Sequence, residues 1–440
     1  MDGHLTRNSS YLSWGRFPRA QQIAVRLHDR HAALPDCELK MLPYGNGRSY
    51  GDSCLNDGGM LLDTRGLDRF IDFDSNRGVL RCEAGIFLKE ILSFAVPRGW
   101  FLPVVPGTQL ITVGGAIAND IHGKNHHRAG TFGAHVLRLE LLRSDGSRLE
   151  CSPEREAEWF AATVGGLGLT GLVTRAEIQM KPVRGPWIDV ETIRYPDLET
   201  FFALSAESDR DYEYTVAWID CSALGRSLGR GFFIRGNHAV TDRNNASSGP
   251  ARGLLVPFEM PFSLMTPLSI RLLNGVYYHS QMRGRRRRTM HYAPFFFPLD
   301  GIACWNRIYG PRGFLQYQFV VPLEHGRDMV RETIEQCARA GISSFMTVLK
   351  VFGDRRSPGL LSYPRPGVTL ALDFPNRGAE LLKLLDRLDD MVAATGGAVY
   401  PAKDARMSGV HFRRFYPQCE RLCKYVDPRF SSSLWRRLMG

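Results

Sequence analysis

Alternation of apolar and polar residues divides the chain into two stretches of different texture. From Cys37 to about Val183, short alternating runs predict strands and helical spacing of apolar residues predicts helices, with glycine-rich turns between them. The expected strands are 60–63, 78–83, 136–143 and 172–180, and the expected helices are 87–96 and 154–164. The pattern predicts a compact mixed α+β domain here.

Beyond Lys181-Pro182-Val183 the apolar runs become longer and richer in aromatic residues. Strands are expected at 213–220, 231–235, 315–322 and 368–374, and helices at 198–208, 327–340 and 379–395. After Gly396 a short loop, 399–406, looks like a further site element. We therefore divide the chain into segments 1–185, 186–395 and 396–440.

The composition is that of a globular protein with large cores, since 44% of the 440 residues are hydrophobic. The formal net charge of +11 favours anionic partners such as nucleotide phosphates, nucleic acid or acidic lipid. Nine scattered cysteines without metal-ligand spacing fit a reducing compartment. The first twenty residues hold no apolar signal region, and Glu259 and three prolines interrupt the most apolar stretch, 253–270. We therefore expect a cytoplasmic protein without a signal peptide or membrane span.

A run of arginines, 283–288, follows the apolar, proline-broken stretch 253–278. A basic cluster beside apolar surface suits a peripheral contact with the inner face of a membrane, or the phosphate of a polyprenyl carrier. A solvated loop is the plainer interpretation. Nucleic acid is disfavoured, because no aromatic residues are interleaved with the basic ones as in a known nucleic-acid module.

The hexapeptide 166–171 satisfies the dinucleotide pattern G-x-G-x-x-G. That pattern must leave a strand and open a helix, whereas here a predicted helix precedes it and a predicted strand follows. We interpret the glycines as a tight turn with close backbone approach, and a nicotinamide-binding Rossmann site is disfavoured.

Two other glycine-rich loops are suited to bind an anion through their backbone N–H groups. The first, 43–52, carries Arg48, whose guanidinium adds a forked donor. The second combines Pro106-Gly107-Thr108 with a helix expected to open at Gly114-Gly115. Together the loops could hold a pyrophosphate, although the first alone could also be an ordinary hairpin turn.

The segment 116–127 follows the second loop and brings together His122, His126 and His127. A metal site is disfavoured, because the His122/His126 pair lies in a Gly-Lys-Asn loop with no carboxylate at helical spacing.

The order of the motifs is specific. They are Gly45-Asn46-Gly47-Arg48-Ser49-Tyr50-Gly51-Asp52, Gly114-Gly115, Asp120-Ile121-His122-Gly123-Lys124-Asn125-His126-His127 and Gly168-Leu169-Thr170-Gly171. With them the chain resembles the vanillyl-alcohol-oxidase (PCMH-type) FAD-binding superfamily and, within it, the decaprenylphosphoryl-β-D-ribose 2′-oxidase family. Further matches run from Trp14-Gly15-Arg16 to Tyr400-Pro401-Ala402-Lys403-Asp404. The resemblance implies an FAD-binding domain (1–185), a substrate domain with an antiparallel sheet flanked by helices (186–395), and a C-terminal segment that returns to the FAD domain (396–440).

The resemblance also implies the site residues. Lys403 and Tyr400 would lie at the flavin face as catalytic residues. Substrate would be bound by Lys350, Gln316, Gln318, Trp218, Tyr309 and Tyr50, with the two glutamines on one side of their strand. FAD would be bound by Gly45, Asn46, Gly47, Arg48, Ser49, Tyr50, Gly51, Pro106, Gly107, Thr108, Val113, Gly114, Gly115, Asn119, Ile121, His122, Asn125, His126, Gly171, Val173 and Tyr400, and no metal is expected.

Oxidation of a secondary alcohol by flavin needs the carbinol C–H aimed at the cofactor while a base takes the hydroxyl proton. By the resemblance, Lys403 would place a cation beside the flavin and stabilise negative charge there. It could act as the base only if burial lowered its pKa. Covalently flavinylated relatives use a histidine in the first glycine loop, and Arg48 stands at that place, so we expect non-covalent FAD.

Two residues depart from the family pattern. Members known as drug targets carry a cysteine at the place of Ala371 and an asparagine at the place of Thr369. Because that cysteine is not catalytic, we expect activity to survive, whereas nitroaromatic inhibitors that trap its thiol should not bond covalently. The change at Thr369 bears on the choice of substrate.

The implied reaction oxidises the 2′-hydroxyl of a polyprenylphosphoryl-β-D-ribofuranose to a ketone, the first step of epimerisation to an arabinose donor for cell-wall arabinan. A short-chain NADH-dependent keto-reductase would complete the epimerisation, and quinone or another acceptor would reoxidise the flavin. One alternative is an FAD-dependent oxidase of a soluble sugar, sugar alcohol or aldonolactone. Another is a flavin-free basic binding protein.

Overall fold

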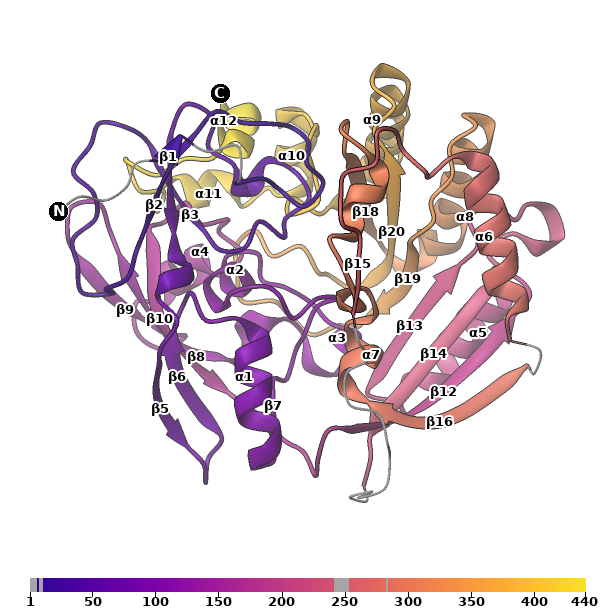
Figure 1. The fold of residues 1–440 in the computed structure, drawn as a ribbon, viewed down its shortest axis with the longest axis horizontal. Helices are drawn as coiled ribbons and strands as arrows, with labels where there is room; N and C mark the ends of the chain where they lie inside the picture. The colour runs from indigo at the N-terminus through magenta and orange to yellow at the C-terminus, as the bar shows by residue number, and fades with distance from the viewer. Residues whose placement is uncertain (1–5, 8–10, 241–252, 282–283) are drawn as a thin grey trace.

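The structure is a computed structural model that describes residues 6–7, 11–240, 253–281 and 284–440. Two β-rich halves lie side by side, and the C-terminal helices pack over the N-terminal half (Figure 1). Strands and helices are both abundant and most strand pairs are antiparallel, so the α+β class expected from the sequence is confirmed.

The N-terminal half contains two main sheets. The smaller has the order β1-β2-β4-β3, formed by Thr6–Arg7, Ile23–Arg26, Met60–Asp63 and Met41–Tyr44. The larger is antiparallel, with the order β5-β6-β10-β8-β9, formed by Phe70–Asp74, Val79–Glu83, Leu172–Gln179, Val136–Leu142 and Arg148–Cys151. Helices α1 (Leu88–Ala95), α2 (Val113–Ala118), α3 (His126–Ala129) and α4 (Ala157–Thr163) connect these strands, and a strand pair joins β7 (Trp100–Phe101) to β11 (Lys181–Pro182).

The second half is built on one antiparallel sheet of eight strands. Its order is β16-β12-β14-β13-β19-β20-β18-β21, formed by Arg285–His291, Trp187–Tyr195, Gly231–His238, Tyr214–Ile219, Thr347–Phe352, Gly367–Pro375, Phe314–Val321 and Ala398–Val399. The helices of this half are α5 (Leu198–Ser208), α6 (Pro267–His279), α7 (Tyr292–Phe296), α8 (Leu323–Arg339) and α9 (Ala379–Ala394), and a parallel pair joins β15 (Leu254–Leu255) to β17 (Ile302–Ala303).

Alternation along the strands gives this sheet two different faces. On one face Leu370, Leu372 and Phe374 of β20 belong to a buried core that helices α5, α8 and α9 complete. Between them, Ala371 and Asp373 point to the other face, where they line a cavity. Because β20 is buried on both faces, it carries apolar residues almost throughout, which explains why the sequence signal for this strand is strong.

The C-terminal segment crosses back to the first half. It pairs β21 with β18, then runs through α10 (Gly409–Phe415), α11 (Cys419–Cys423) and α12 (Ser433–Met439). Arg437 of α12 donates to both Asp52 and Asp404, and these carboxylates are almost fully buried. A Cβ on Gly51 would overlap the Asp404 carbonyl oxygen, so only glycine permits this close approach. The division of the chain into the three segments stays a prediction.

The expected elements are found with shifts of a few residues at their ends. Several elements were not foreseen, among them the interior strands β12 and β19 and the helices α10, α11 and α12, and two more concern stretches that the sequence analysis had interpreted otherwise. The arginine run was interpreted as a cluster or loop, but Arg285–His291 form the edge strand β16, which pairs with β12 in seven consecutive register positions. Arg283 of that run lies outside the described residues. The proline-broken apolar stretch contains helix α6, which starts at Pro267, where proline is compatible with a first helical position. Within the described residues no helix is both long and apolar enough to span a membrane.

Candidate active site

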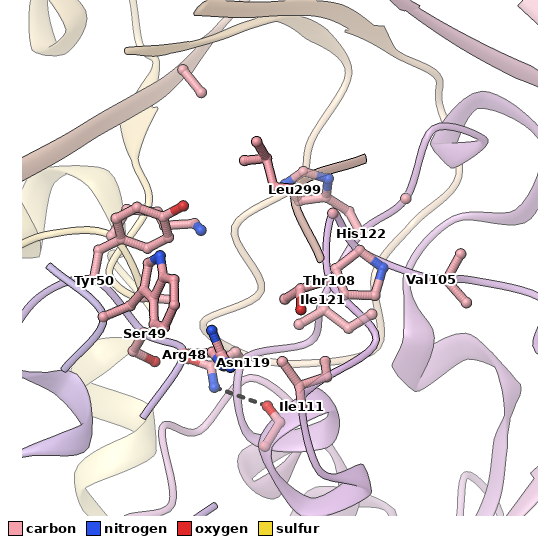
Figure 2. Close-up of a pocket in the computed structure, with 18 of the residues that line it drawn as sticks. Arg48, Ser49, Tyr50, Val105, Thr108, Ile111, Asn119, Ile121, His122 and Leu299 are labelled. Atoms are coloured by element: carbon pink, nitrogen blue, oxygen red, sulfur yellow. Dashed lines mark hydrogen bonds between the residues drawn. The ribbon is translucent and has the colours of Figure 1, made fainter. Parts of the chain in front are cut away.

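A cavity of about 700 Å³ is lined by residues of both halves, a volume within the usual range for small-molecule sites. The N-terminal half contributes the loop after β3, the loop 105–112, the start of α2 and the segment 118–124. The eight-stranded sheet contributes side chains from its cavity face, and the C-terminal segment contributes Tyr400, Ala402 and Lys403. Figure 2 shows Arg48, Ser49 and Tyr50 on one side of this space and Thr108, Ile121 and His122 on the other.

The glycine loops give one part of the cavity a backbone-rich wall. Gly45, Gly47, Gly107, Gly114 and Gly115 all line it. A Cβ on Gly107 would meet no protein atom within 4 Å, so the loop leaves open space in front of its backbone. Thr112 caps α2 by accepting from Gly115 N at 3.2 Å, which fixes the turn on which the glycine pair sits.

Arg48 is held in this wall with spare donor capacity. Its guanidinium carbon lies 3.9 Å from the centroid of the Trp14 ring, a cation–π contact. Its Nε is buried and has no hydrogen-bond partner among the described residues. A buried guanidinium donor without a partner is costly, so this loop is suited to an anionic ligand group.

At another part of the cavity, Lys403 is surrounded by aromatic and acidic groups. Its ammonium lies 3.8 Å from the centroid of the Tyr50 ring. Burial lowers the pKa of Lys403, and the negative charge of Asp373 opposes that shift. Burial likewise raises the pKa of Asp373, whose Oδ1 accepts from Gln316 Nε2 at 2.5 Å. Lys403 and Asp373 are thus two buried titratable groups on the cavity wall whose charges influence each other.

A second polar cluster forms around His122. Lys350 Nζ lies 3.1 Å from His122 Nδ1, and the Gln318 amide lies 3.2 Å from His122 Nε2. Burial lowers the pKa of Lys350 to about 7, and the cations Lys124 and Lys403 contribute to the same shift. Burial also lowers the pKa of His122 well below its usual value, so this imidazole is neutral. The cluster offers several hydrogen-bonding groups with little fixed charge.

Tyr400 and Thr369 make contacts that hold these clusters in place. The Tyr400 hydroxyl donates to Asn119 O at 3.0 Å, and the ring stacks on Tyr363 with centroids 4.4 Å apart. The Thr369 hydroxyl lies 2.9 Å from the Tyr363 hydroxyl and accepts from Gln318 Nε2 at 3.3 Å. Thr369 therefore positions the Gln318 amide.

Comparison with known proteins shows the family to which this chain belongs. The protein-family model described as "FAD binding domain" matches residues 28–152. Decaprenylphosphoryl-beta-D-ribose oxidase of Mycolicibacterium smegmatis (strain ATCC 700084 / mc(2)155) is 37% identical over 409 residues, which cover 90% of this chain and 88% of that protein. The chain belongs to the decaprenylphosphoryl-beta-D-ribose oxidase family. It is an FAD-dependent oxidoreductase with a PCMH-type FAD-binding domain, as expected from the sequence.

Two further relatives show where the similarity extends. The "Uncharacterized protein in mprA 5'region" of Streptomyces coelicolor is 35% identical over 375 residues, 80% of this chain and all of that protein. Cytokinin dehydrogenase 7 of Oryza sativa subsp. japonica is 29% identical over 184 residues, only 39% of this chain and 33% of that protein.

The cavity fits the cofactor of this oxidase family. Anion-binding backbone at Gly45–Gly47 and Gly114–Gly115, together with the unpartnered Arg48 Nε, suits the pyrophosphate of FAD. Of the residues expected to bind FAD or substrate, the cavity is lined by Gly45, Asn46, Gly47, Arg48, Ser49, Tyr50, Pro106, Gly107, Thr108, Gly114, Gly115, Asn119, Ile121, His122, Gly171, Val173, Trp218, Gln316, Gln318, Lys350, Tyr400 and Lys403.

Five expected residues of the oxidase do not line the cavity. Tyr309 stacks on Phe314 at 4.2 Å between centroids, is buried, and is not one of the residues that line the cavity. His126 packs on the Phe352 ring, and neither of its buried nitrogens has a hydrogen-bond partner in the part of the chain that the structure describes. The other three support the loops: Gly51 lies against Asp404, Val113 is a fully buried first residue of α2, and Asn125 donates to Pro103 O.

The structure also adds residues that the sequence reasoning missed. Asp373 and Lys124 line the cavity, and the Lys124 ammonium donates to Phe295 O. Burial lowers the pKa of Lys124 to about 7. A signal for Asp373 existed, since it alternates with Thr369 and Ala371, which had both been singled out. The described residues contain no group of three metal-ligating side chains.

Proposed function

We propose that this flavoprotein oxidises the 2′-hydroxyl of a polyprenylphosphoryl-β-D-ribofuranose to the 2-keto product. The name of the relative from Mycolicibacterium smegmatis supports the substrate class. The observation that carries the proposal is the continuity of the cavity. It joins the glycine loops to the Lys403–Asp373 pair and to a mouth at Tyr277 and Arg288, which are both exposed to solvent. Ribose, phosphate and lipid tail would then follow one another along this path.

Lys403 is proposed as the proton acceptor. When bound, FAD supplies the acceptor for the hydride that leaves the carbinol carbon. Because burial lowers the pKa of Lys403, a larger fraction of its amine is neutral and able to take the hydroxyl proton. The ammonium formed would be stabilised by the Tyr50 ring and the Asp373 carboxylate. Tyr400 would hold the cofactor side of the site in place through its bond to Asn119.

The cluster of Lys350, Gln318 and His122 is proposed to orient the sugar hydroxyls. These side chains hold one another at hydrogen-bond distance, so their geometry is set before substrate arrives. Gln316 and Trp218 would complete the binding wall from the same sheet face. Thr369, as the anchor of Gln318, connects a departure from the family pattern to substrate choice.

The partners also belong to the proposal. A short-chain NADH-dependent keto-reductase would act on the ketone, and quinone or another acceptor would reoxidise the flavin. FAD is proposed to be held without a covalent bond, since the first glycine loop offers Arg48 and no histidine. A peripheral contact with the membrane suits the lipid-linked substrate.

The runner-up is oxidation of a soluble sugar, sugar alcohol or aldonolactone, which the same polar clusters would accommodate. The deciding experiment is anaerobic flavin reduction, followed at the flavin absorbance maximum. Polyprenylphosphoryl ribose should bleach the flavin at low concentration, while free ribose, alditols and aldonolactones should not. Equal bleaching by a free sugar would favour the runner-up.

A variant test addresses Lys403 directly. Lys403→Ala should retain flavin but reduce the rate of substrate-driven bleaching by about 10²–10⁴-fold, the usual contribution of a positioned base. Lys89→Ala, an exposed lysine of α1, is the matched control and should bleach normally. Undiminished anaerobic reduction in Lys403→Ala would refute its role.

A further inference from the structure

Exposed apolar side chains are concentrated in one part of this molecule. Of the seventeen large hydrophobic residues exposed in the described chain, ten lie between Leu254 and Tyr277. Scattered exposed apolar residues are normal, but a contiguous group marks an interaction surface. The group centres on helix α6, which Figure 1 shows at the edge of the second half.

Helix α6 presents its apolar residues outward. Leu268, Leu272 and Val276 follow one another at one-turn spacing and are 79%, 66% and 64% exposed. The inward side is fixed by Ile270, which is buried, and by Asn274, which donates to Asp220 Oδ1 at 3.1 Å. The helix is thus anchored on one side and unpartnered on the other. Such an arrangement is the reverse of a helix that hides its apolar stripe in a core.

Helix α6 stands at the cavity mouth. Its Tyr277 ring lies 4.7 Å from the ring of Trp218 between centroids, and both residues line the cavity. Because Tyr277 is also 46% exposed, the cavity reaches the molecular surface at this helix. A lipid tail leaving the cavity here would pass directly along α6.

Arginines of the edge strand β16 flank the helix on the same sheet face. Arg286 is in register with Thr192 and Arg288 with Val190, and both partners line the cavity. Arg287, between them, points to the opposite face, where it donates to Glu191. Among the described residues Arg286, Arg288 and the exposed Arg271 of α6 form no ion pair, unlike Arg287. Three cations therefore border the apolar face without a counter-charge.

Acidic residues are scarce in the segment of the chain that carries this surface, although the buried Asp220 contacts α6 from its inward side. In the sequence from 253 to 303 the only carboxylates are Glu259 and Asp300. Glu259 pairs with Arg16, and Asp300 accepts from Gln109 N. Apolar side chains bordered by uncompensated arginines match a bilayer with anionic headgroups, where the apolar face enters the lipid and the cations meet phosphate. A protein seated over α6 would instead cover the cavity mouth.

From these observations we infer that the exposed face of α6, with Arg271, Arg286 and Arg288, docks on an anionic phospholipid bilayer and opens the cavity mouth towards the lipid. The lipid surface is the occupant in this inference. The inference deepens the proposed function, and it depends on that function for the lipid-linked substrate.

The test measures binding of the full-length holoenzyme to vesicles by co-sedimentation. The parent protein should bind phosphatidylglycerol-containing vesicles at least 10-fold more tightly than pure phosphatidylcholine vesicles. Leu272→Glu/Val276→Glu and, separately, Arg286→Ser/Arg288→Ser should each weaken binding to the anionic vesicles by at least 10-fold. The matched controls are Val410→Glu, an equally exposed apolar residue of α10, and Arg285→Ser, one position along β16, and both should bind like the parent.

Three results would overturn the inference: a parent that shows no preference for anionic vesicles, patch variants that bind these vesicles as well as the parent does, or control variants that lose as much binding as the patch variants. A parent that is dimeric without vesicles, and that Leu272→Glu/Val276→Glu makes monomeric, would assign the face to a second copy instead. Flavin reduction by a detergent-dispersed, short-chain prenylphosphoryl ribose is measured in parallel. It should be unchanged in Leu272→Glu/Val276→Glu. Failure of that reduction in the parent would count against the proposed substrate, while the vesicle result would stand by itself.

Discussion

Asp373 is the residue whose role follows most directly from its surroundings. It faces Lys403, Gln316, Tyr50 and Tyr309, and Lys403 is the only cation among them. Its negative charge favours the protonated amine and so raises the pKa of Lys403 against the effect of burial. Burial lowers the pKa of Lys403, and the Asp373 carboxylate partly opposes that shift, so it raises the pH at which the proposed base loses its proton.

We therefore predict the pH dependence of flavin reduction in Asp373→Asn. Loss of the carboxylate removes an interaction that favours ammonium, so the pKa of Lys403 falls further. The rate, which requires the neutral amine, should then rise at lower pH than in the parent, and Asp373→Glu should restore the parent profile. The measurement is the anaerobic reduction rate from pH 6 to pH 10, and superimposable profiles would contradict the assignment.

Ala371 yields a second residue-level prediction. It lines the cavity in register with Gln318 and Val348, so a thiol at this position would face the ligand space. Nitroaromatic inhibitors should leave the parent unmodified, while Ala371→Cys should gain the mass of one covalent adduct during turnover. Intact-protein mass spectrometry reports both, with Cys54, the native thiol lining the cavity, as the internal control. An adduct on the parent would contradict the prediction.

The sequence revealed residues that carry a motif and missed those that depend on packing. Gly45–Tyr50 and Tyr400–Lys403 were found because their order along the chain is distinctive. Tyr309 was expected to bind substrate, and the sequence could not show that its ring stacks on Phe314 outside the cavity lining. His126 looked like a ligand residue for the same reason, since only the fold turns it towards Phe352.

At the scale of elements, periodicity located β13, β14, β18 and β20 of the eight-stranded sheet but missed its interior strands β12 and β19. Burial on both faces leaves an almost continuous apolar run in strands such as β20. The edge strand β16 lacked that signal. Its four consecutive arginines resemble a solvated loop, and only pairing with β12 shows that alternate arginines belong to different faces.

The contribution of the α12 contacts to stability can be measured directly with variants. Arg437 joins Asp52 and Asp404, and removing one partner of such a buried network commonly costs about 3–5 kcal/mol. We expect Arg437→Ala to lower the free energy of unfolding by about 3 kcal/mol. Arg327→Ala, which breaks the exposed pair with Glu199, should cost under about 1 kcal/mol. Denaturant melts of the holoenzymes compare the two variants. Equal losses in the free energy of unfolding would show that the buried α12 network contributes no more than an exposed ion pair.

At the scale of the whole molecule, the cofactor cavity is formed jointly by the two halves, so FAD should hold them together. Ligand that binds only the folded state adds about 2.7 kcal/mol at 100 times its Kd. We predict that the apoprotein melts at lower temperature and that added FAD restores the melting temperature in a concentration-dependent way. Acid precipitation should release all flavin into the supernatant. Flavin that stays with the pellet would contradict non-covalent binding.

The hydrogen bond from Tyr50 N to Ala402 O, 2.9 Å long, joins two segments that are translated at different times. The glycine loops precede Lys403 and the helices that anchor its loop by several hundred residues, so they are translated first. A nascent or truncated chain that ends before this loop contains the glycine loops but lacks the residue proposed as the base. Synthesis therefore delays the proposed proton abstraction until the segment that carries Lys403 has been made, well after the glycine loops.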